Sequence, residues 1–519
     1  MEKYFGQISK SIFWVSAVVA LAFVFLAMIF PTEVNDSFRW LLNFTITNLG
    51  WFYLGAGMLF LVFCFALAFS KYGSIKLGKD DEEPEYSTKH WFAMLFSAGM
   101  GIGLVFWGVA EPINHLAAAP FAESGSPRAA AEAMRASFFH WGLHPWSFYG
   151  VVAIALGYFS FRKDLPGLIS SCFYPVLGEE GIKGPIGKTI DIIAVVVTLF
   201  GVATSLGLGV LQVTGGLNFL YDTPNTVGVS LLIVAIFTIL FTMSAFSGIN
   251  RGIKWLSNTN MTIAVILLIF FIIFGPARYL LNIFVESLGS YVHNIVWMSF
   301  FLDTQGEAAA NAGFDWTGAW TVFYWAWWIT WAPFVGSFIA RISRGRTIRE
   351  AVMGILVAPT LFCFIWFAFL GGTAINMELL QGLPISEAVF TDLTSSLFTV
   401  FSYLPMSEIF SILAMIMVSI FFITSADSAT FVVGMMTSGG ALEPKGGLKI
   451  FWGIIQGAIA AGLIVTGGLE SVQAVALAAG LPFMVIMLFM VYSMLKGLRE
   501  DEMVQPCTPI ISTKGSKLQ

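Results

Sequence analysis

Long apolar stretches alternate with short polar connections along almost the whole chain. Each stretch holds about 20 mostly apolar residues, the length that an α-helix needs to cross the hydrocarbon core of a bilayer. Because such stretches recur, the pattern predicts an all-α integral membrane protein with about twelve transmembrane helices. The predicted spans are residues 11–30, 51–70, 91–109, 138–159, 190–220, 227–246, 260–274, 320–338, 351–370, 409–433, 448–466 and 472–495.

The composition supports a membrane protein and excludes other classes. Of the 519 residues, 57% are hydrophobic and only 11% are charged, too few charges to cover the surface of a soluble protein of this length. The formal net charge of -5 argues against a nucleic-acid partner. The four cysteines, Cys64, Cys172, Cys363 and Cys507, lie far apart, so neither a disulfide framework nor a metal site is predicted from them.

The basic residues of the connections predict the orientation of the chain. If the N-terminus is cytoplasmic, the outside connections contain only Arg39, Arg128, Arg135 and Arg278 of the 26 Lys and Arg residues. An excess of Lys and Arg marks cytoplasmic loops. We therefore expect a multi-pass protein of the inner (plasma) membrane, with both termini cytoplasmic and the first span retained rather than cleaved as a signal peptide.

Five consecutive parts follow from this topology. The third predicted span runs outward and the eighth inward, so two five-helix units would be inverted relative to each other. Secondary transporters built in this way place the substrate site near the bilayer midplane. The parts are 1–90, an N-terminal tail with two peripheral transmembrane helices; 91–275, a first five-helix repeat; 276–319, an outside segment; 320–496, a second five-helix repeat; and 497–519, a short cytoplasmic tail.

The outside segment contains one predicted amphipathic helix. Its apolar positions recur at helical spacing, at Leu281, Phe284, Leu288, Val292 and Ile295. A helix with one such apolar face is expected to lie along the membrane surface.

The third predicted span contains three alternate glycines, Gly99, Gly101 and Gly103. Glycine is a poor helix former, so this run predicts a break in the helix. Close packing of helices through small residues is the alternative interpretation. An unwound backbone at membrane depth is tolerated where it lines a cavity and contacts a ligand or an ion. On that interpretation, the three glycines belong to a substrate-binding site.

Tryptophans are crowded in the eighth predicted span. Trp320, Trp325, Trp327, Trp328 and Trp331 fall within about 18 Å of helix. Tryptophan is usually enriched at membrane interfaces, but this length places some of the rings in mid-membrane.

The fourth predicted span adds Trp141, Trp146 and Tyr149, which can reach a cavity shared with the eighth span. Aromatic rings that converge without a nearby carboxylate form a box for a quaternary ammonium group, held by cation–π attraction. An acidic site would bind the same cation but would also accept Lys, Arg and metal ions. The box therefore favours a weakly hydrated, methylated cation.

The tenth predicted span carries a run of hydroxyl side chains, Thr424, Ser425, Ser428 and Thr430. Such hydroxyls most often bond carbonyls of their own helix, and we expect this of Ser428 and Thr430. For Thr424 and Ser425 a second role is open, because hydroxyl oxygens and unwound carbonyls are the hard ligands that sodium prefers.

Two acids within or beside the predicted spans have two interpretations each. Asp427 is the single acid of the tenth span, and Glu111 precedes Pro112 at the outer end of the third. An intramembrane acid is a functional candidate by default, but a structural hydrogen-bond anchor is an equal alternative. His140 and His144 show no metal-ligand spacing and are expected to be packed or hydrogen bonded. The sequence has no catalytic triad or nucleotide motif, so we predict neither an enzyme nor a cofactor.

These segments together resemble the betaine/carnitine/choline transporter family over nearly the whole chain. The matching stretches are the glycine run 99–103, Glu111-Pro112, the His140-Trp141 to Tyr149 segment, residues 323–328 and residues 424–428. The resemblance implies twelve helices, an inverted five-plus-five repeat of the amino-acid:sodium symporter type, and a homotrimer.

The resemblance also implies roles for particular residues. Trp141, Trp146, Tyr149 and Trp328 would form the central box, with Trp325, Trp327 and Trp331 along the substrate path. The coupling sodium ion would be bound by the backbone of Ser97 and Met100, the carbonyl of Phe421, and the hydroxyls of Thr424 and Ser425.

Branches of that family differ at positions that can be read here. Proton-coupled choline carriers tend to have an acid in the glycine run, whereas this chain has Gly103. Sodium-independent carnitine exchangers place an Arg in the seventh span, and residues 257–262 contain none. A second sodium site is in doubt, because Thr198 is followed one turn later by Val202. These features favour sodium-coupled uptake of a quaternary ammonium compatible solute such as glycine betaine.

Other functions are weighed against this one. A choline or carnitine carrier of the same family would use the same box. A sodium-coupled amino-acid symporter of the same fold would keep the sodium residues but would not need the box. A channel is disfavoured, because the sequence shows neither a pore-lining ring of charges nor a filter motif.

Overall fold

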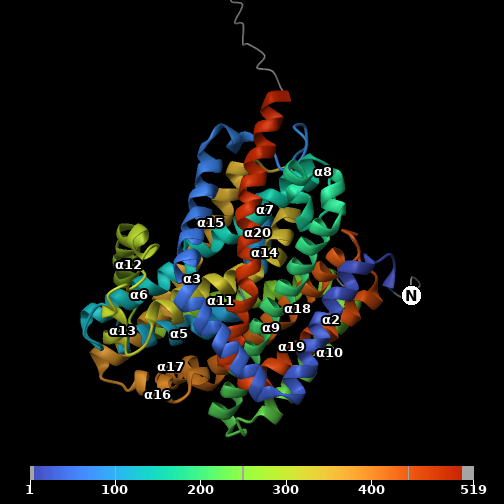
Figure 1. The fold of residues 1–519 in the computed structure, drawn as a ribbon. Coiled ribbons are helices and arrows are strands. Elements are labelled where there is room, and N and C mark those ends of the chain that lie inside the picture. Colours follow the sequence, from blue (N-terminus) through green and yellow to red (C-terminus); the bar gives the residue numbers. More distant parts are fainter. Residues whose placement is uncertain (1–4, 100, 248–249, 442, 505–519) are drawn as a thin grey trace, which may run out of the picture.

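The structure of the protein is a computed structural model, which describes residues 5–99, 101–247, 250–441 and 443–504. Its regular structure is helical (Figure 1). The helices are α2 (Lys10–Ile29), α3 (Pro31–Phe69), α4 (Thr88–Gly99), α5 (Ile102–Ala117), α6 (Pro127–Trp141), α7 (Leu143–Gly157), α8 (Tyr174–Lys183), α9 (Pro185–Tyr221), α10 (Val227–Ser247), α11 (Asn250–Phe274), α12 (Ala277–Met298), α13 (Glu307–Ala312), α14 (Phe323–Ile342), α15 (Ile348–Gln381), α16 (Ile385–Thr391), α17 (Ser396–Ser402), α18 (Ser407–Thr437), α19 (Gly446–Gly467) and α20 (Leu469–Val504).

Within the described residues, nine helices are long and apolar enough to cross a membrane: α2, α3, α9, α10, α11, α15, α18, α19 and α20. The other three predicted spans are built differently. Residues 91–109 fall on α4 and α5, and residues 138–159 fall mainly on α6 and α7. Residues 320–338 begin in a π-type turn, Thr317–Val322, and continue in α14.

Helix α3 begins at Pro31, well before the predicted start of the second span at residue 51. Proline suits the first position of a helix, where its missing N–H is not needed. Phe38, Leu42 and Ile46 follow at four-residue spacing and pack against the core, which holds this additional length of helix in place. The prediction missed it because Asn43 and other polar residues interrupt the apolar pattern.

Helix α14 lies in the interior of the bundle. It packs against α7, α9 and α20, and its tryptophans are buried. Figure 1 shows α12 at one side of the bundle and α2 at the other, with the central helices between them. The residues predicted to form the aromatic box therefore come from the most enclosed part of the protein.

The amphipathic helix predicted in the outside segment is present as α12. Its buried face agrees with the predicted one in part. Phe284, Leu288 and Ile295 pack against the core as predicted, whereas Leu281 and Val292 are exposed. The fully buried positions include Leu280, Ile283 and Tyr291. The buried face packs against α6 and α15. Of the predicted apolar stripe, Leu281 and Val292 are therefore the two positions that stay exposed.

Candidate functional site

The helix break predicted at the glycine run is confirmed. Helix α4 ends at Gly99 and α5 begins at Ile102, with Gly101 in an extended conformation (φ -142, ψ -170). Met100 lies outside the described residues, and so does the side chain of Ser97. Gly99 is described as the last residue of α4. Gly101 thus lies at the break as an extended residue, and its carbonyl accepts the N–H of Leu104 in the first turn of α5 (3.2 Å).

A second break, at Gly142, was not predicted. Helix α6 ends at Trp141 and α7 begins at Leu143. A Cβ atom at Gly142 would lie 2.5 Å from the carbonyl oxygen of Phe138 and 2.8 Å from the hydroxyl of Tyr291. Only glycine fits this position. The break places Trp141 at the end of α6, whereas Trp146 and Tyr149 lie on α7.

The four residues predicted to form the box come together in the structure. Trp328 of α14 is the common neighbour: its ring centroid lies 5.3 Å from that of Trp141, 5.7 Å from Trp146 and 5.4 Å from Tyr149. Trp146 and Tyr149 also meet edge to face, with centroids 5.6 Å apart. All four side chains are buried. The rings of α6 and α7 therefore surround one side of Trp328.

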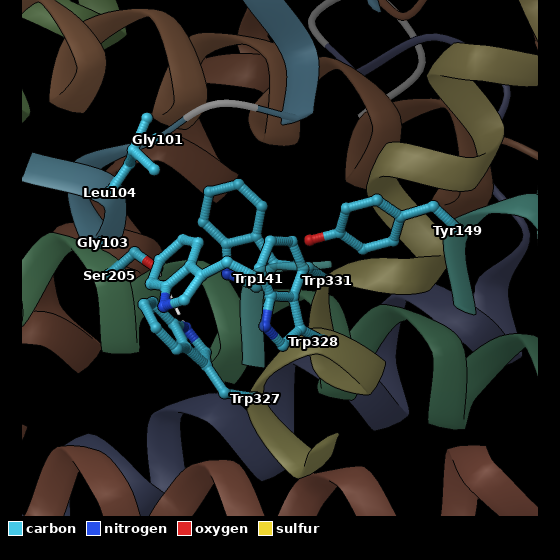
Figure 2. Close-up of a pocket in the computed structure, with 9 residues that line it drawn as sticks. All are labelled: Gly101, Gly103, Leu104, Trp141, Tyr149, Ser205, Trp327, Trp328 and Trp331. Atoms are coloured by element: carbon cyan, nitrogen blue, oxygen red, sulfur yellow. Dashed lines mark hydrogen bonds between the residues drawn. The ribbon is translucent and has the colours of Figure 1, made fainter. Parts of the chain in front are cut away.

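A small cavity lies among these rings (Figure 2). Its lining residues are Gly101, Gly103, Leu104, Trp141, Tyr149, Ser205, Trp327, Trp328 and Trp331. Its volume is about 30 Å³, close to the share of one water molecule in the liquid. The rings therefore pack closely around this cavity.

Two further tryptophans of α14 are fixed to α9 at the cavity. The indole N–H of Trp327 donates to the hydroxyl of Ser205 (3.2 Å), and that of Trp331 donates to the carbonyl of Gly201 (2.9 Å). Figure 2 shows the Trp327–Ser205 bond beside the other rings. Ser205 was not predicted, because a single serine in a long apolar helix gives no signal by itself.

Gly103 permits the close approach of Trp327. A Cβ atom at Gly103 would lie 2.2 Å from Cη2 of Trp327 and 3.1 Å from Cη2 of Trp141. Real side chains do not come this close, so any other residue would displace the indole. Gly101 is less crowded, since its Cβ would lie 3.4 Å from Trp331.

Trp325 lies away from this cavity. Its ring stacks on His144, with centroids 5.4 Å apart and planes at 14°. Its other neighbours include Phe139 and Phe148. A role for Trp325 in the substrate path stays a prediction, whereas His144 is packed as expected.

The expectation that the box has no nearby carboxylate is wrong. Oε2 of Glu111 accepts hydrogen bonds from the indole N–H of Trp141 (2.8 Å) and the hydroxyl of Tyr324 (2.6 Å). Oε1 lies 2.7 Å from Nδ1 of His140 and 3.4 Å from Nε2 of His115. The carboxylate contacts the N–H at the edge of the indole and not the face of the ring.

On α18, several hydroxyls bond their own helix. Thr424 donates to the carbonyl of Ile420 (2.9 Å), and Thr430 donates to that of Ala426 (2.7 Å), as expected for Thr430. Asp427 accepts a hydrogen bond from Ser244 of α10 (2.5 Å), which supports its structural interpretation. Ser425 and Phe421 are buried. The sodium site stays a prediction.

The comparisons with known proteins agree with this architecture. The profile described as "BCCT, betaine/carnitine/choline family transporter" matches residues 11–503. The chain is 47% identical over 493 residues to the glycine betaine transporter OpuD of Bacillus subtilis, covering 95% of each chain. It is 44% identical over 499 residues to the ectoine/hydroxyectoine transporter of Virgibacillus pantothenticus, covering 96% of this chain and 98% of that one.

A third relative, a probable glycine betaine transporter of Desulfitobacterium hafniense, is 44% identical over 495 residues, covering 95% of this chain and 98% of that one. The chain is thus a multi-pass membrane transporter and not an enzyme. It belongs to the betaine/carnitine/choline transporter family.

Proposed function

We propose that this protein takes up a quaternary ammonium compatible solute, glycine betaine in the first instance, by sodium-coupled secondary active transport. The observation that carries the proposal is the contact of Trp328 with three aromatic rings from the fourth predicted span. Two of the relatives described above are named as glycine betaine transporters, one of them as probable.

The chemistry of the box suits a methylated cation. An indole or phenol face attracts a cation, and the attraction is largest where water is excluded. A quaternary ammonium group has no N–H to lose and is weakly hydrated, so its transfer into an apolar box costs less than that of a primary ammonium group. Within the described residues, the buried N–H of Trp328 has no hydrogen-bond partner and is available to a polar group of the ligand.

The coupling ion would be bound where the break between α4 and α5 faces α18. The proposed ligands are the backbone of Ser97 and Met100, the carbonyl of Phe421, and the hydroxyls of Thr424 and Ser425. Hydroxyl and carbonyl oxygens at a broken helix are typical of sodium sites in transporters. Occupation by sodium would stabilise the conformation in which the broken helix can receive the substrate.

The finer architecture belongs to the same proposal. About twelve transmembrane helices would be arranged as an inverted five-plus-five repeat, 91–275 and 320–496, with both termini cytoplasmic. We expect the protein to act as a homotrimer in the inner membrane.

A second substrate class is favoured by one relative. The Virgibacillus pantothenticus protein is named for ectoine and hydroxyectoine, which carry a delocalised cation rather than a methylated one. Choline and carnitine carriers of the family, and an amino-acid symporter of the same fold, are further alternatives.

Uptake by the purified protein in liposomes tests these alternatives together. Labelled glycine betaine, choline, carnitine, ectoine and alanine would be offered in turn, with an inward sodium gradient and with potassium replacing sodium. We expect saturable, sodium-dependent uptake of glycine betaine. Equal uptake in potassium would refute the coupling, and a preference for alanine would refute the substrate class.

A further inference from the structure

Glu111 is a buried acid that is bonded directly to the aromatic box. It lies on α5, the helix that begins at the glycine break, and its side chain has no exposed surface. One of its oxygens accepts hydrogen bonds from both Trp141 of α6 and Tyr324 of α14. The two donors come from the two halves of the chain that enclose the cavity.

The partners of Glu111 identify its chemical state in this network. The indole of Trp141 can only donate, and it reaches one oxygen of Glu111. Nδ1 of His115 accepts from Trp316, so the ring proton of a neutral His115 lies on Nε2, which faces the other oxygen. A carboxyl group that accepts on both oxygens is the ionised form. His140 and His115 occupy the second oxygen. The outer nitrogens of these histidines are engaged as well: Nε2 of His140 lies 3.0 Å from the hydroxyl of Thr321, and Nδ1 of His115 accepts from Trp316.

The bond to Trp141 bears on cation binding in two ways. It fixes the indole by its edge, so that the ring contacts Trp328 at a centroid distance of 5.3 Å. Hydrogen bonding to a charged acceptor also draws the N–H proton toward the oxygen and leaves more electron density on the ring. Because cation–π attraction depends on the negative face of the ring, both effects strengthen the box.

We propose that Glu111 is a positioning residue for substrate recognition, which acts on the cation through the indole of Trp141 and not by contact. The proposal rests on the function proposed above. It explains how an acid can serve the site without turning it into a general cation site: the aromatic ring stands between the charge and the ligand. Affinity for every quaternary ammonium substrate should then depend on Glu111, with or without a carboxylate on the substrate.

The test is a double-mutant cycle in the full-length protein, with dissociation constants for labelled glycine betaine and choline and with initial uptake rates. Glu111→Gln keeps the shape of the side chain and removes its charge. We expect the dissociation constant and KM to rise about tenfold for both ligands, with the maximal rate changed by less than about twofold. Trp141→Phe keeps a ring but has no N–H, so adding Glu111→Gln to it should change affinity no further.

Trp316→Phe is the matched control. It removes an indole N–H from the same buried network, at His115, but its ring does not line the cavity. Affinity in this variant should fall less than in Glu111→Gln, because the bond between Glu111 and Trp141 is kept. If Glu111→Gln fails to reach the membrane, the N–H alone can be removed by placing the benzothiophene analogue of tryptophan at position 141. This change should raise the dissociation constant about tenfold, as expected for Glu111→Gln.

Three results would overturn the proposal: unchanged affinity in Glu111→Gln or with the benzothiophene analogue, a fall in maximal rate alone, or a loss in Glu111→Gln that persists in the Trp141→Phe background. A different result would refute the function proposed above: the unmutated protein itself would then bind no quaternary ammonium solute.

Discussion

The aromatic box and the region proposed for sodium differ in how far the structure assembles them. In the box, three rings from α6 and α7 already contact Trp328 of α14, and two more indoles are fixed by hydrogen bonds to α9. On α18, Thr424 is bonded to its own helix. This difference indicates that the proposed substrate site depends on side-chain packing between helices. A sodium site at Thr424 would instead need the lone pairs of the Thr424 hydroxyl to point toward the helix break.

The largest effect should come from removing the central ring of the box. Trp328→Leu leaves an apolar side chain at this position but removes its π face from the box. A desolvated cation–π contact contributes about 2 kcal/mol or more, so the dissociation constant for glycine betaine should rise by one to two orders of magnitude, roughly. Equilibrium binding to the purified protein measures this, and Trp328→Phe should be milder.

Trp325→Phe sharpens the same prediction. Trp325 is a neighbour of Trp328 on α14, but its ring stacks on His144 outside the cavity. Its replacement by phenylalanine should change affinity less than the same replacement at Trp328. A loss at Trp325 as large as that at Trp328 would mean that the substrate path includes Trp325, and that this cavity is not the whole site.

A smaller effect is expected in the region proposed for sodium. Thr424→Ala and Ser425→Ala each remove one oxygen ligand, so the sodium concentration for half-maximal uptake should rise about tenfold while the order of preferred substrates is kept. Thr430→Ala is the matched control, since its hydroxyl bonds Ala426 on the same helix. Sodium dependence that is identical in all three variants would remove these hydroxyls from the site.

A still smaller loss of affinity should follow from crowding the ring of Trp327. Gly103→Ala introduces a Cβ atom that would lie 2.2 Å from the indole, and overpacking of this kind costs about 1 kcal/mol or more. We expect KM for glycine betaine to rise about fivefold as the ring is displaced. Gly55→Ala on α3 is a suitable control, because nothing lies within 4 Å of its Cβ position. Equal KM values for Gly103→Ala and Gly55→Ala would show that the ring of Trp327 has room to adjust.

The smallest effect should come from Ser205→Ala, which removes the acceptor of the Trp327 N–H. A neutral hydrogen bond contributes about 1 kcal/mol, so KM should rise about threefold to fivefold. An unchanged KM would mean that the orientation of Trp327 does not depend on α9. The measurement is uptake at graded substrate concentrations in liposomes.

The sequence predicted features that depend on residue type and periodicity. The glycine run predicted the break at Gly101. The crowded aromatic residues predicted rings around a shared cavity, and the family resemblance implied that Trp328 meets the rings of the fourth span. Features that arise from contacts between distant segments could not be predicted in this way. A lone glycine such as Gly142 does not identify a break, and the bond between Glu111 and Trp141 exists only after α5 and α6 pack together.

The central claim is that the box binds the positive charge of its ligand and not merely its shape. Glycine betaine can be compared with 3,3-dimethylbutanoate, in which carbon replaces the quaternary nitrogen and the carboxylate is kept. Competition of each against labelled glycine betaine, on the purified protein, measures the contribution of the charge alone. We expect 3,3-dimethylbutanoate, which lacks the positive charge, to bind at least about thirtyfold more weakly, which corresponds to about 2 kcal/mol of cation–π attraction. Equal competition by the two compounds would contradict the account.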